Sequence, residues 1–158
     1  MTETQRALDL AYKALNRRER TVCELRAHLG GKRVEPDAID AAIVELEQAR
    51  LLDDAGFARR FAQDKRALER WGAERIEREL SRRGVARDLV EAAIGEQDRD
   101  CELDSALELL AEKVREPPAD DRARDRAWRM LVRKGYAPEL AYDAVRAHAA
   151  RAGARGTF

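Results

Sequence analysis

A pair of adjacent carboxylates is the first feature of the sequence that could do chemistry. Asp53 and Asp54 stand in the stretch ARLLDDAGFARRFAQDK (residues 49–65), between two leucines and two phenylalanines. Paired acids can hold a divalent cation, but such a site needs a third ligand at suitable spacing, and none is evident. We therefore interpret the pair as part of the boundary between two helices. Asp53 or Asp54 is expected to cap a helix that begins near Ala55, and Leu51–Leu52 to close the helix before it.

A second candidate is the sequence GGK at residues 30–32, which resembles part of a phosphate-binding loop. The full motif requires glycine at position 26 and serine or threonine at position 33, where this chain has Arg26 and Arg33. The motif is therefore incomplete, and we do not expect a nucleotide site.

The cysteines and histidines are isolated from one another. Cys23 and Cys101 belong to no CxxC motif, and Cys23 is expected to be half-buried on a helix. His28 and His148 fall in different parts of the chain, and each is expected at the surface. The sequence predicts no catalytic residue, no metal site and no cofactor, so it favours a protein that is not an enzyme.

Charge is balanced overall but unevenly distributed. Lys and Arg number 31, Asp and Glu number 31, and charged residues make up 39% of the 158 residues, so net charge favours neither nucleic acid nor membrane. Alternate segments are basic and acidic: 16–33 (six bases, two acids), 34–54 (one, seven), 59–87 (ten, five), 88–121 (three, twelve) and 122–155 (nine, three). Solvated helix faces are the favoured explanation; the alternative is a surface that meets a partner with alternating charge.

The N-terminal residues lack the apolar core of a secretion signal, and no run approaches the roughly 18 apolar residues of a membrane span. Two unpaired cysteines suit a reduced compartment. We expect a soluble, cytoplasmic protein.

Apolar residues recur at helical spacing, and no stretch alternates long enough for a strand, so the sequence predicts an all-α fold. A repeat of 51 residues is also present. It aligns ELRAHLGGKRVEPDAIDAAI, RIERELSRRGVARDLVEAAI and RAWRMLVRKGYAPELAYDAV. Apolar residues occupy equivalent positions in the three copies: Leu29, Leu80 and Leu131; Val34, Val85 and Tyr136; and Ile43, Ile94 and Val145. Repetition at a fixed period indicates tandem helical units.

Each repeat contains the same helix end and helix start. Gly84 and Gly135 are expected to supply a left-handed cap, and Pro36 and Pro138 each to begin the following helix. The first repeat has Arg33 at the glycine position, so we expect its helix to end earlier, at Gly30 or Gly31, with a longer turn.

The predicted plan is three tandem three-helix units, at residues 5–50, 54–97 and 101–150, in an elongated, curved and monomeric arrangement. The third unit contains REPPADD (115–121), which is predicted to form a loop. The final RAGARGTF (151–158) is expected to fray.

Three-helix units with a glycine turn resemble helix-turn-helix DNA readers, and a small DNA-binding transcription regulator is therefore the alternative function. The third helix of the first two units is acidic, which argues against insertion into a DNA groove. Basic residues lie on the first and second helices instead, and these are the candidate partner-binding residues: Arg17, Arg18, Arg20, Arg59, Arg60, Lys65, Arg66, Arg70, Arg75, Arg78, Arg82 and Arg83. Trp71 and Trp128 are expected in the core rather than as platforms for base stacking.

Four segments of the chain resemble the RecX family of regulatory proteins, in the family's order and over most of residues 7–146. They are ALNRRERTVCELRAHL, LLDDAGFARRFAQDKR, GAERIERELSRRGV and AWRMLVRKGYAPELAYDAV. Arg50 stands where the family usually has glycine.

The resemblance implies three wingless helix-turn-helix-like repeats that bind the groove of a RecA–DNA filament. It further implies inhibition of strand exchange, of ATP hydrolysis and of LexA cleavage. We expect Arg82 and Arg83 to be exposed and to contact acidic filament surface or DNA phosphate. The alternative is that they serve only as favourable charges at the helix C-terminus before Gly84. The third candidate function is that of a helical scaffold without such activity.

Overall fold

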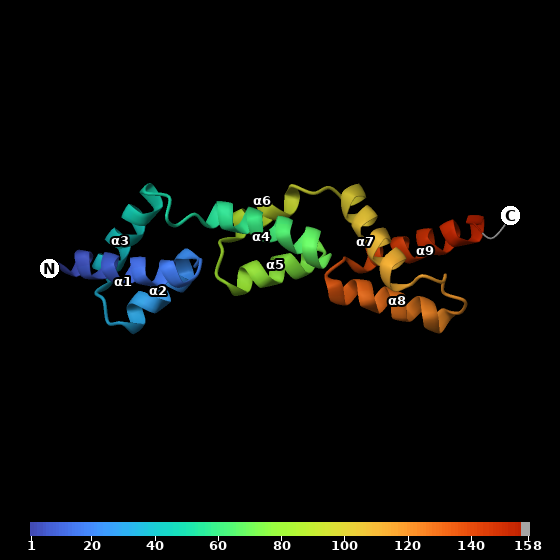
Figure 1. Ribbon diagram of the computed structural model, residues 1–158, viewed down its shortest axis with the longest axis horizontal. Coiled ribbons are helices and arrows are strands. Elements are labelled where there is room, and N and C mark those ends of the chain that lie inside the picture. The colour runs from blue at the N-terminus through green and yellow to red at the C-terminus, as the bar shows by residue number, and fades with distance from the viewer. Residues whose placement is uncertain (156–158) are drawn as a thin grey trace. The chain divides into compact units, whose positions relative to one another are not determined.

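The computed structural model confirms the all-α prediction. It describes residues 1–155, apart from the side chains of residues 152, 154 and 155, and this part of the chain contains helices and no strand (Figure 1). The helices are α1 (Glu3–Arg17), α2 (Val22–Gly31), α3 (Pro36–Gln48), α4 (Asp54–Glu69), α5 (Ala73–Arg82), α6 (Arg87–Gly95), α7 (Arg99–Lys113), α8 (Asp121–Lys134) and α9 (Pro138–Arg155).

The 51-residue repeat appears as one recurring turn after the second helix of each group of three. The residue after the turn donates its backbone N–H to the helix behind it in all three copies: Val34 to Leu29 (3.2 Å), Val85 to Leu80 (3.1 Å) and Tyr136 to Leu131 (3.1 Å). All six side chains are buried. This is the hydrogen bond of a Schellman cap, and the apolar contact that accompanies it fixes the direction of the next helix.

The expectation that the first turn is longer is wrong. α2 ends at Gly31, as expected, but the turn that follows it is no longer than the turn after α5. Arg33 adopts the left-handed conformation (φ 60°) that Gly84 (φ 83°) and Gly135 (φ 102°) adopt in the other two copies. A non-glycine residue is strained in this conformation. Arg33 is held in this conformation because the Val34 N–H bonds to Leu29 and the Val34 side chain is buried.

The helix punctuation predicted at the acidic pair is confirmed for Asp53. Its carboxylate accepts a hydrogen bond from the backbone N–H of Gly56 at 3.0 Å, at the start of α4. Asp54 has a different role, because its carboxylate accepts from the N–H of Val22 at 3.0 Å. Pro138 begins α9 as expected, and residues 115–120 lie in a loop.

Contacts divide the chain into two compact units, each described by itself. The first comprises Met1–Arg59 and Leu80–Val90, and the second comprises Arg60–Glu79 and the chain from Glu91 onward. The division at 5–50, 54–97 and 101–150 stays a prediction. The helix α9 continues to Arg155, so residues 151–155 are helical rather than frayed, and the last three residues lie outside the described part.

The first unit has its core where α1, α2 and α3 meet (Figure 1). Three alanines of α1, at positions 7, 11 and 14, are fully or almost fully buried, which permits close approach of the neighbouring helices. Larger side chains from α2 and α3, among them Leu25, Leu29 and Leu46, fill the space.

The second unit has its core where α7, α8 and α9 meet. Tyr136 lies at its centre with no exposed surface, and its hydroxyl donates to the carbonyl of Arg70 at 2.8 Å. Burial raises the pKa of this phenol. The tyrosine therefore ties the end of α4 to the turn that follows α8.

Candidate functional site

Basic side chains gather around His28 in the first unit. They come from the ends of α1 and α2, and we name Arg17, Arg18, Arg20 and Lys32 the N-terminal basic cluster. Burial lowers the pKa of His28, and the charges of Arg20, Lys32, Arg17 and Arg18 lower it further. All four cations act on the imidazole in the same direction.

The side chains of two members of this cluster contact neighbouring groups. Arg20 donates from Nε to the carbonyl of Ala14 at 3.2 Å, and Arg18 forms an ion pair with Glu24 at 3.4 Å. Arg17 and Lys32 are exposed. Arg18 is exposed as well, so only Arg20 is half-buried.

A second set of basic side chains surrounds Trp71 in the second unit. The Nζ of Lys65 lies 4.7 Å from the centre of the indole ring, and the guanidinium of Arg75 lies 4.1 Å from it. Phe61 meets the indole edge-on, with 6.1 Å between ring centres. The half-buried indole thus holds two cations by cation–π contacts, which differs from the core position expected for Trp71.

The end of α8 completes this second set. Lys134 donates from Nζ to the carbonyl of Glu69 at 3.0 Å, and Arg75 donates to the carbonyl of Arg133 at 3.5 Å. The hydrogen bond from Lys65 (2.8 Å) lowers the pKa of the Glu69 carboxyl, and the charges of Lys65, Lys134 and Arg75 add to this.

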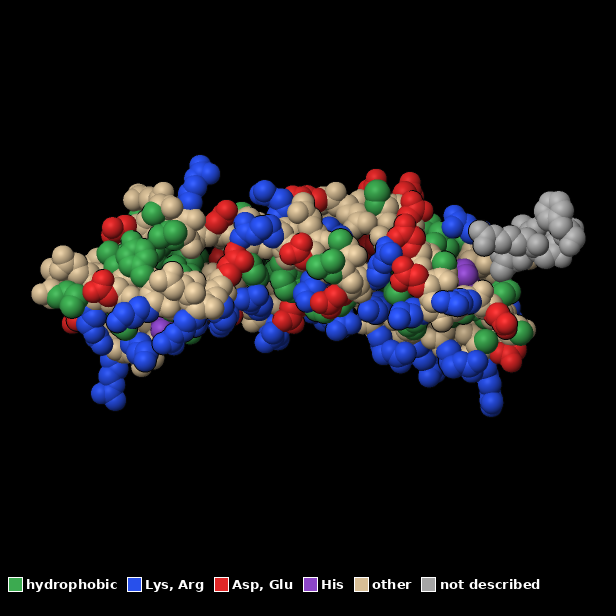
Figure 2. Space-filling model, viewed as in Figure 1, with side chains coloured by type: hydrophobic (Ala, Val, Ile, Leu, Met, Phe, Trp, Pro, Cys, Tyr) green, Lys and Arg blue, Asp and Glu red, His purple; other side chains and the backbone are tan. Residues whose placement is uncertain are grey.

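We name Lys65, Arg75, Arg133 and Lys134 the C-terminal basic cluster. Three of its cations, Lys65, Arg75 and Lys134, act on the Glu69 carboxylate, and Arg133 precedes Lys134 on α8. Clustered Lys and Arg side chains suit phosphate groups or carboxylates of a large partner. Lys and Arg side chains also gather on the visible surface of α8 (Figure 2).

Comparison with known proteins agrees with these groups of three helices. The sequence matches the family model of the RecX first three-helix domain at residues 7–46 and that of the RecX second three-helix domain at residues 53–94. The chain is 35% identical to the regulatory protein RecX of Mycobacterium avium, covering 92% of this chain and 86% of the relative. The chain belongs to the RecX family.

Further relatives have the same description. The regulatory protein RecX of Chromobacterium violaceum is 33% identical over 130 residues, which is 82% of each chain. The crystal structure of RecX from Lactobacillus salivarius superposes with a TM-score of 0.83 at 17% identity, covering 92% of this chain and 96% of that one. At this identity the likeness extends to the fold alone.

Not every predicted arginine of this RecX family member belongs to a cluster. Arg66 donates to the carbonyl of Ile94 at 2.9 Å, at the end of α6, and burial lowers its pKa. Arg70 pairs with Glu108 and, at 2.9 Å, with Glu112 of α7. Both side chains hold helices of the second unit together, which is a structural role.

The expectation that Arg83 is exposed is wrong. Only 19% of its side chain is exposed, because it pairs with Glu24 at 2.8 Å and lies over the ring of Phe57 at 4.5 Å. Arg83 therefore joins α2, α4 and the turn after α5. Arg82 is exposed, as expected. Arg59, Arg60 and Arg78 are exposed too, and none of the four is a member of either cluster.

Sequence reasoning missed Lys32, Arg133 and Lys134. A signal was available, because Lys32, Arg83 and Lys134 are spaced by 51 residues and each precedes the left-handed residue of its turn. The repeat thus provides a basic residue at the same position three times. Arg83 and Lys134 are half-buried, whereas Lys32 is exposed.

The cysteine and the possible metal ligands form no reactive site in the described residues. Cys23 is exposed rather than half-buried, and the described residues contain no group of three or more His, Cys, Asp or Glu side chains that could hold a metal ion. Every helix in residues 1–155 is too short or too polar to span a bilayer.

Proposed function

We propose that this chain binds the RecA–DNA filament and inhibits its ATPase, strand-exchange and LexA-coprotease activities. The observation that carries the proposal is membership of the RecX family of regulatory proteins. The two basic clusters support it, because they offer cations to the phosphates of filament DNA or to acidic side chains of the recombinase. In this proposal the chain acts by occupying a surface, without a catalytic step.

A DNA-binding transcription regulator is the second candidate, since the same clusters would suit a DNA backbone. The outward face of α3, which would be the recognition helix of the first group, argues against it. Its exposed charged residues, Asp37, Asp40, Glu45 and Glu47, are all acidic, and the helix has no basic residue. Such a helix is repelled by the phosphates that line a groove.

A DNA-dependent ATPase assay with a RecA recombinase tests the proposal. We expect added protein to lower ATP hydrolysis at or below the stoichiometry of the recombinase. An unchanged rate over a hundredfold range of added protein would overturn the proposal. Tight binding to one duplex sequence in the absence of recombinase would favour the transcription regulator.

Charge reversal locates the contact surface within the same assay. We expect Arg17→Glu combined with Lys32→Glu to weaken inhibition at least tenfold and to reduce its salt dependence, because each lost phosphate contact lowers the salt slope by roughly one. Both side chains are exposed, so the fold should survive. Unchanged inhibition would exclude the N-terminal basic cluster.

The matched control changes the same amount of charge elsewhere. Arg115 and Arg122 are exposed and lie outside both clusters. Their double replacement by Glu should alter inhibition by less than about twofold, since distant surface charges are largely screened at physiological salt. A loss equal to that of the cluster variant would mean that inhibition depends on net charge alone.

A further inference from the structure

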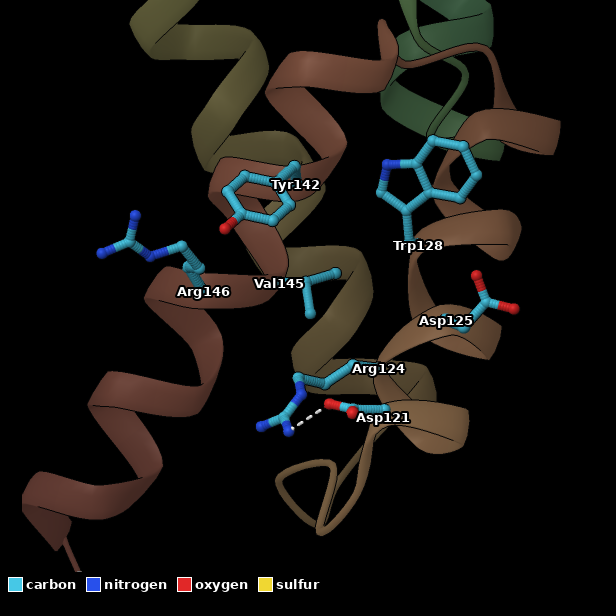
Figure 3. Close-up of a pocket in the computed structure, with 7 residues that line it drawn as sticks. All are labelled: Asp121, Arg124, Asp125, Trp128, Tyr142, Val145 and Arg146. Atoms are coloured by element: carbon cyan, nitrogen blue, oxygen red, sulfur yellow. Dashed lines mark hydrogen bonds and ion pairs between the residues drawn. The ribbon is translucent and has the colours of Figure 1, made fainter.

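A groove lies between α8 and α9 in the second unit, and none of its lining residues belongs to the C-terminal basic cluster. Its volume is about 610 Å³, and it is lined by Asp121, Arg124, Asp125, Trp128, Tyr142, Val145 and Arg146 (Figure 3). This volume is within the range of grooves and pockets that hold a ligand's side chains or rings. The two family-model matches end at residues 46 and 94, so neither covers the groove.

The apolar part of the groove is held firmly in place. The indole of Trp128 donates from Nε1 to the carbonyl of Pro138 at 3.0 Å, which fixes this wall against the start of α9. Val145, only 5% exposed, forms part of the floor. Tyr142 is 57% exposed although it is a large side chain, so the groove presents an uncovered aromatic surface.

The charges around the groove leave one cation unmatched. Asp121 pairs with Arg124 at 2.7 Å, and Asp125 pairs with Arg129 at 3.0 Å, so both acids of the groove have a basic partner on α8. The guanidinium of Arg146 lies 6.0 Å from the ring centre of Tyr142 and has no carboxylate partner among the described residues. An occupant with an acidic group near an apolar group would complete the site.

We propose that this groove binds a short segment of a partner protein, with an apolar side chain placed between Trp128 and Tyr142 and an adjacent Asp or Glu paired with Arg146. Trp, Tyr and Arg are the residues most enriched at the energetic centres of protein–protein interfaces. The inference goes beyond the proposed function, because it concerns a separate surface and does not depend on the basic clusters.

Single-stranded nucleic acid fits the groove less well. A base could stack on Tyr142 as an apolar side chain would, so the rings alone do not decide between the two occupants. The carboxylates of Asp121 and Asp125 would face the successive phosphates of the strand. A peptide needs only one acidic group at the site, so the charges of the groove favour a protein segment.

The test uses the full chain and a blocked synthetic peptide, SDLFDS, which carries apolar side chains between acids. The chain has two tryptophans, so its ¹⁵N spectrum contains two indole signals, and Trp128→Phe identifies the one from the groove. We expect the peptide, added to about 1 mM, to shift the Trp128 signal and leave the Trp71 signal in place. SDAADS and SKLFKS are the controls for the apolar and acidic parts.

Tyr142→Ala and Arg146→Glu should each weaken this binding at least tenfold, and because both side chains are exposed the fold should survive. The matched controls are Tyr12→Ala, which removes an exposed tyrosine of α1, and Arg151→Glu, which reverses an exposed charge of α9. These should bind the peptide as the natural chain does. Equal binding by Tyr142→Ala and Arg146→Glu would overturn the proposal.

Two other results would also overturn it: no shift of the Trp128 signal with SDLFDS, or a shift with a short oligothymidylate alone. The ATPase assay keeps this claim separate from the proposed function. Inhibition of the recombinase without peptide binding would refute the groove and leave the proposed function standing. Peptide binding without inhibition would refute the proposed function and leave the groove proposal standing.

Discussion

The hydroxyl of Thr21 donates a hydrogen bond to the carbonyl of Arg83, 62 residues later, at 2.7 Å. The same oxygen accepts from the backbone N–H of Glu24 at 3.1 Å, so one side chain caps α2 and joins it to the turn that follows α5. Thr21 has no exposed surface and is the buried polar residue of the described core. A single hydroxyl therefore couples a local helix cap to a long-range contact.

Replacement of Thr21 by valine should destabilise the protein by about 2–4 kcal/mol. Loss of the cap costs about 1 kcal/mol, and a buried carbonyl left without its donor costs about 1–3 kcal/mol. Urea unfolding followed by circular dichroism measures the change. Thr2→Val is the control, since Thr2 forms the same capping box on α1 in an exposed position. Its loss should cost only about 1 kcal/mol; equal costs would show that the Arg83 contact contributes nothing.

A corresponding contact in the second unit depends on glycine. The N–H of Gly72 donates to the carbonyl of Lys134 at 2.8 Å, and the N–H of Glu74 donates to that of Gly135 at 2.9 Å. A methyl group on Gly135 would lie 2.6 Å from the backbone nitrogen of Arg75 and 2.9 Å from the oxygen of Gly72. The backbones of α5 and of the turn after α8 could not remain this close.

Gly135→Ala should therefore destabilise the protein by more than about 2 kcal/mol, since strain at positive φ adds to the clash. Gly30→Ala is the matched control. Gly30 is inside α2 and has open space around the position of a methyl group, so alanine should stabilise the helix by about 0.5–1 kcal/mol. Thermal unfolding of both variants checks the prediction, which fails if Gly135→Ala unfolds at the same temperature as the natural chain.

The sequence was sufficient to predict features that repeat. Leu29, Leu80 and Leu131 share one phase of the 51-residue period, and each is fully buried. The turns after α5 and α8 were predicted from glycine, because glycine at the end of a helix reports a left-handed backbone directly. Arg33 misled the same reasoning, since a cap imposed by the burial of Val34 overrode the preference of the residue itself.

Contacts between distant segments could not be read from the sequence. Arg83 resembles any exposed basic residue before a capping glycine, and only the folded chain places Glu24 and Phe57 beside it. Asp54 likewise looks like half of a capping pair, whereas it accepts from Val22. Each depends on a neighbour more than 25 positions away, which neither periodicity nor composition reports.

Leu80→Ala should destabilise the protein by about 2–5 kcal/mol, because Leu80 is fully buried and truncation leaves a cavity. The control is Leu68→Ala, whose side chain is 80% exposed, and which should change stability by less than about 0.5 kcal/mol. Denaturant titration measures both. A loss below about 0.5 kcal/mol at Leu80 would contradict the alignment of the repeats.

Glu24 should make the first unit sensitive to acid. Burial raises its pKa, but the hydrogen bonds from the Thr21 backbone and the Arg83 guanidinium outweigh burial and bring the pKa to about 2, from 4.5 in an unfolded chain. A depressed pKa stabilises the folded state above pH 4.5, and this contribution is lost as the pH falls from 4.5 to 2. Between pH 5 and pH 3 the loss is about 2 kcal/mol.

Glu24→Gln removes this titration while keeping a side-chain oxygen that can accept from Thr21. The natural chain should therefore lose about 2 kcal/mol more stability between pH 5 and pH 3 than the variant does. Urea unfolding at several pH values measures the difference. The other carboxylates titrate in both proteins and cancel, so parallel curves would show that Glu24 is not specially stabilised as an anion.

His28 should report whether the N-terminal basic cluster meets an anionic partner. Burial and four neighbouring cations lower its pKa in the free protein. A bound polyanion offsets those cations, so the pKa should rise toward its ordinary value of about 6.5, and binding should strengthen as the pH falls through the interval between the two values.

NMR titration of the imidazole signals with and without a short oligothymidylate measures the shift. His148, the other histidine of the chain, lies on α9 in the second unit and serves as the internal reference. A His28 pKa that stays unchanged in the presence of bound oligothymidylate would place the contact away from Arg17 and Lys32.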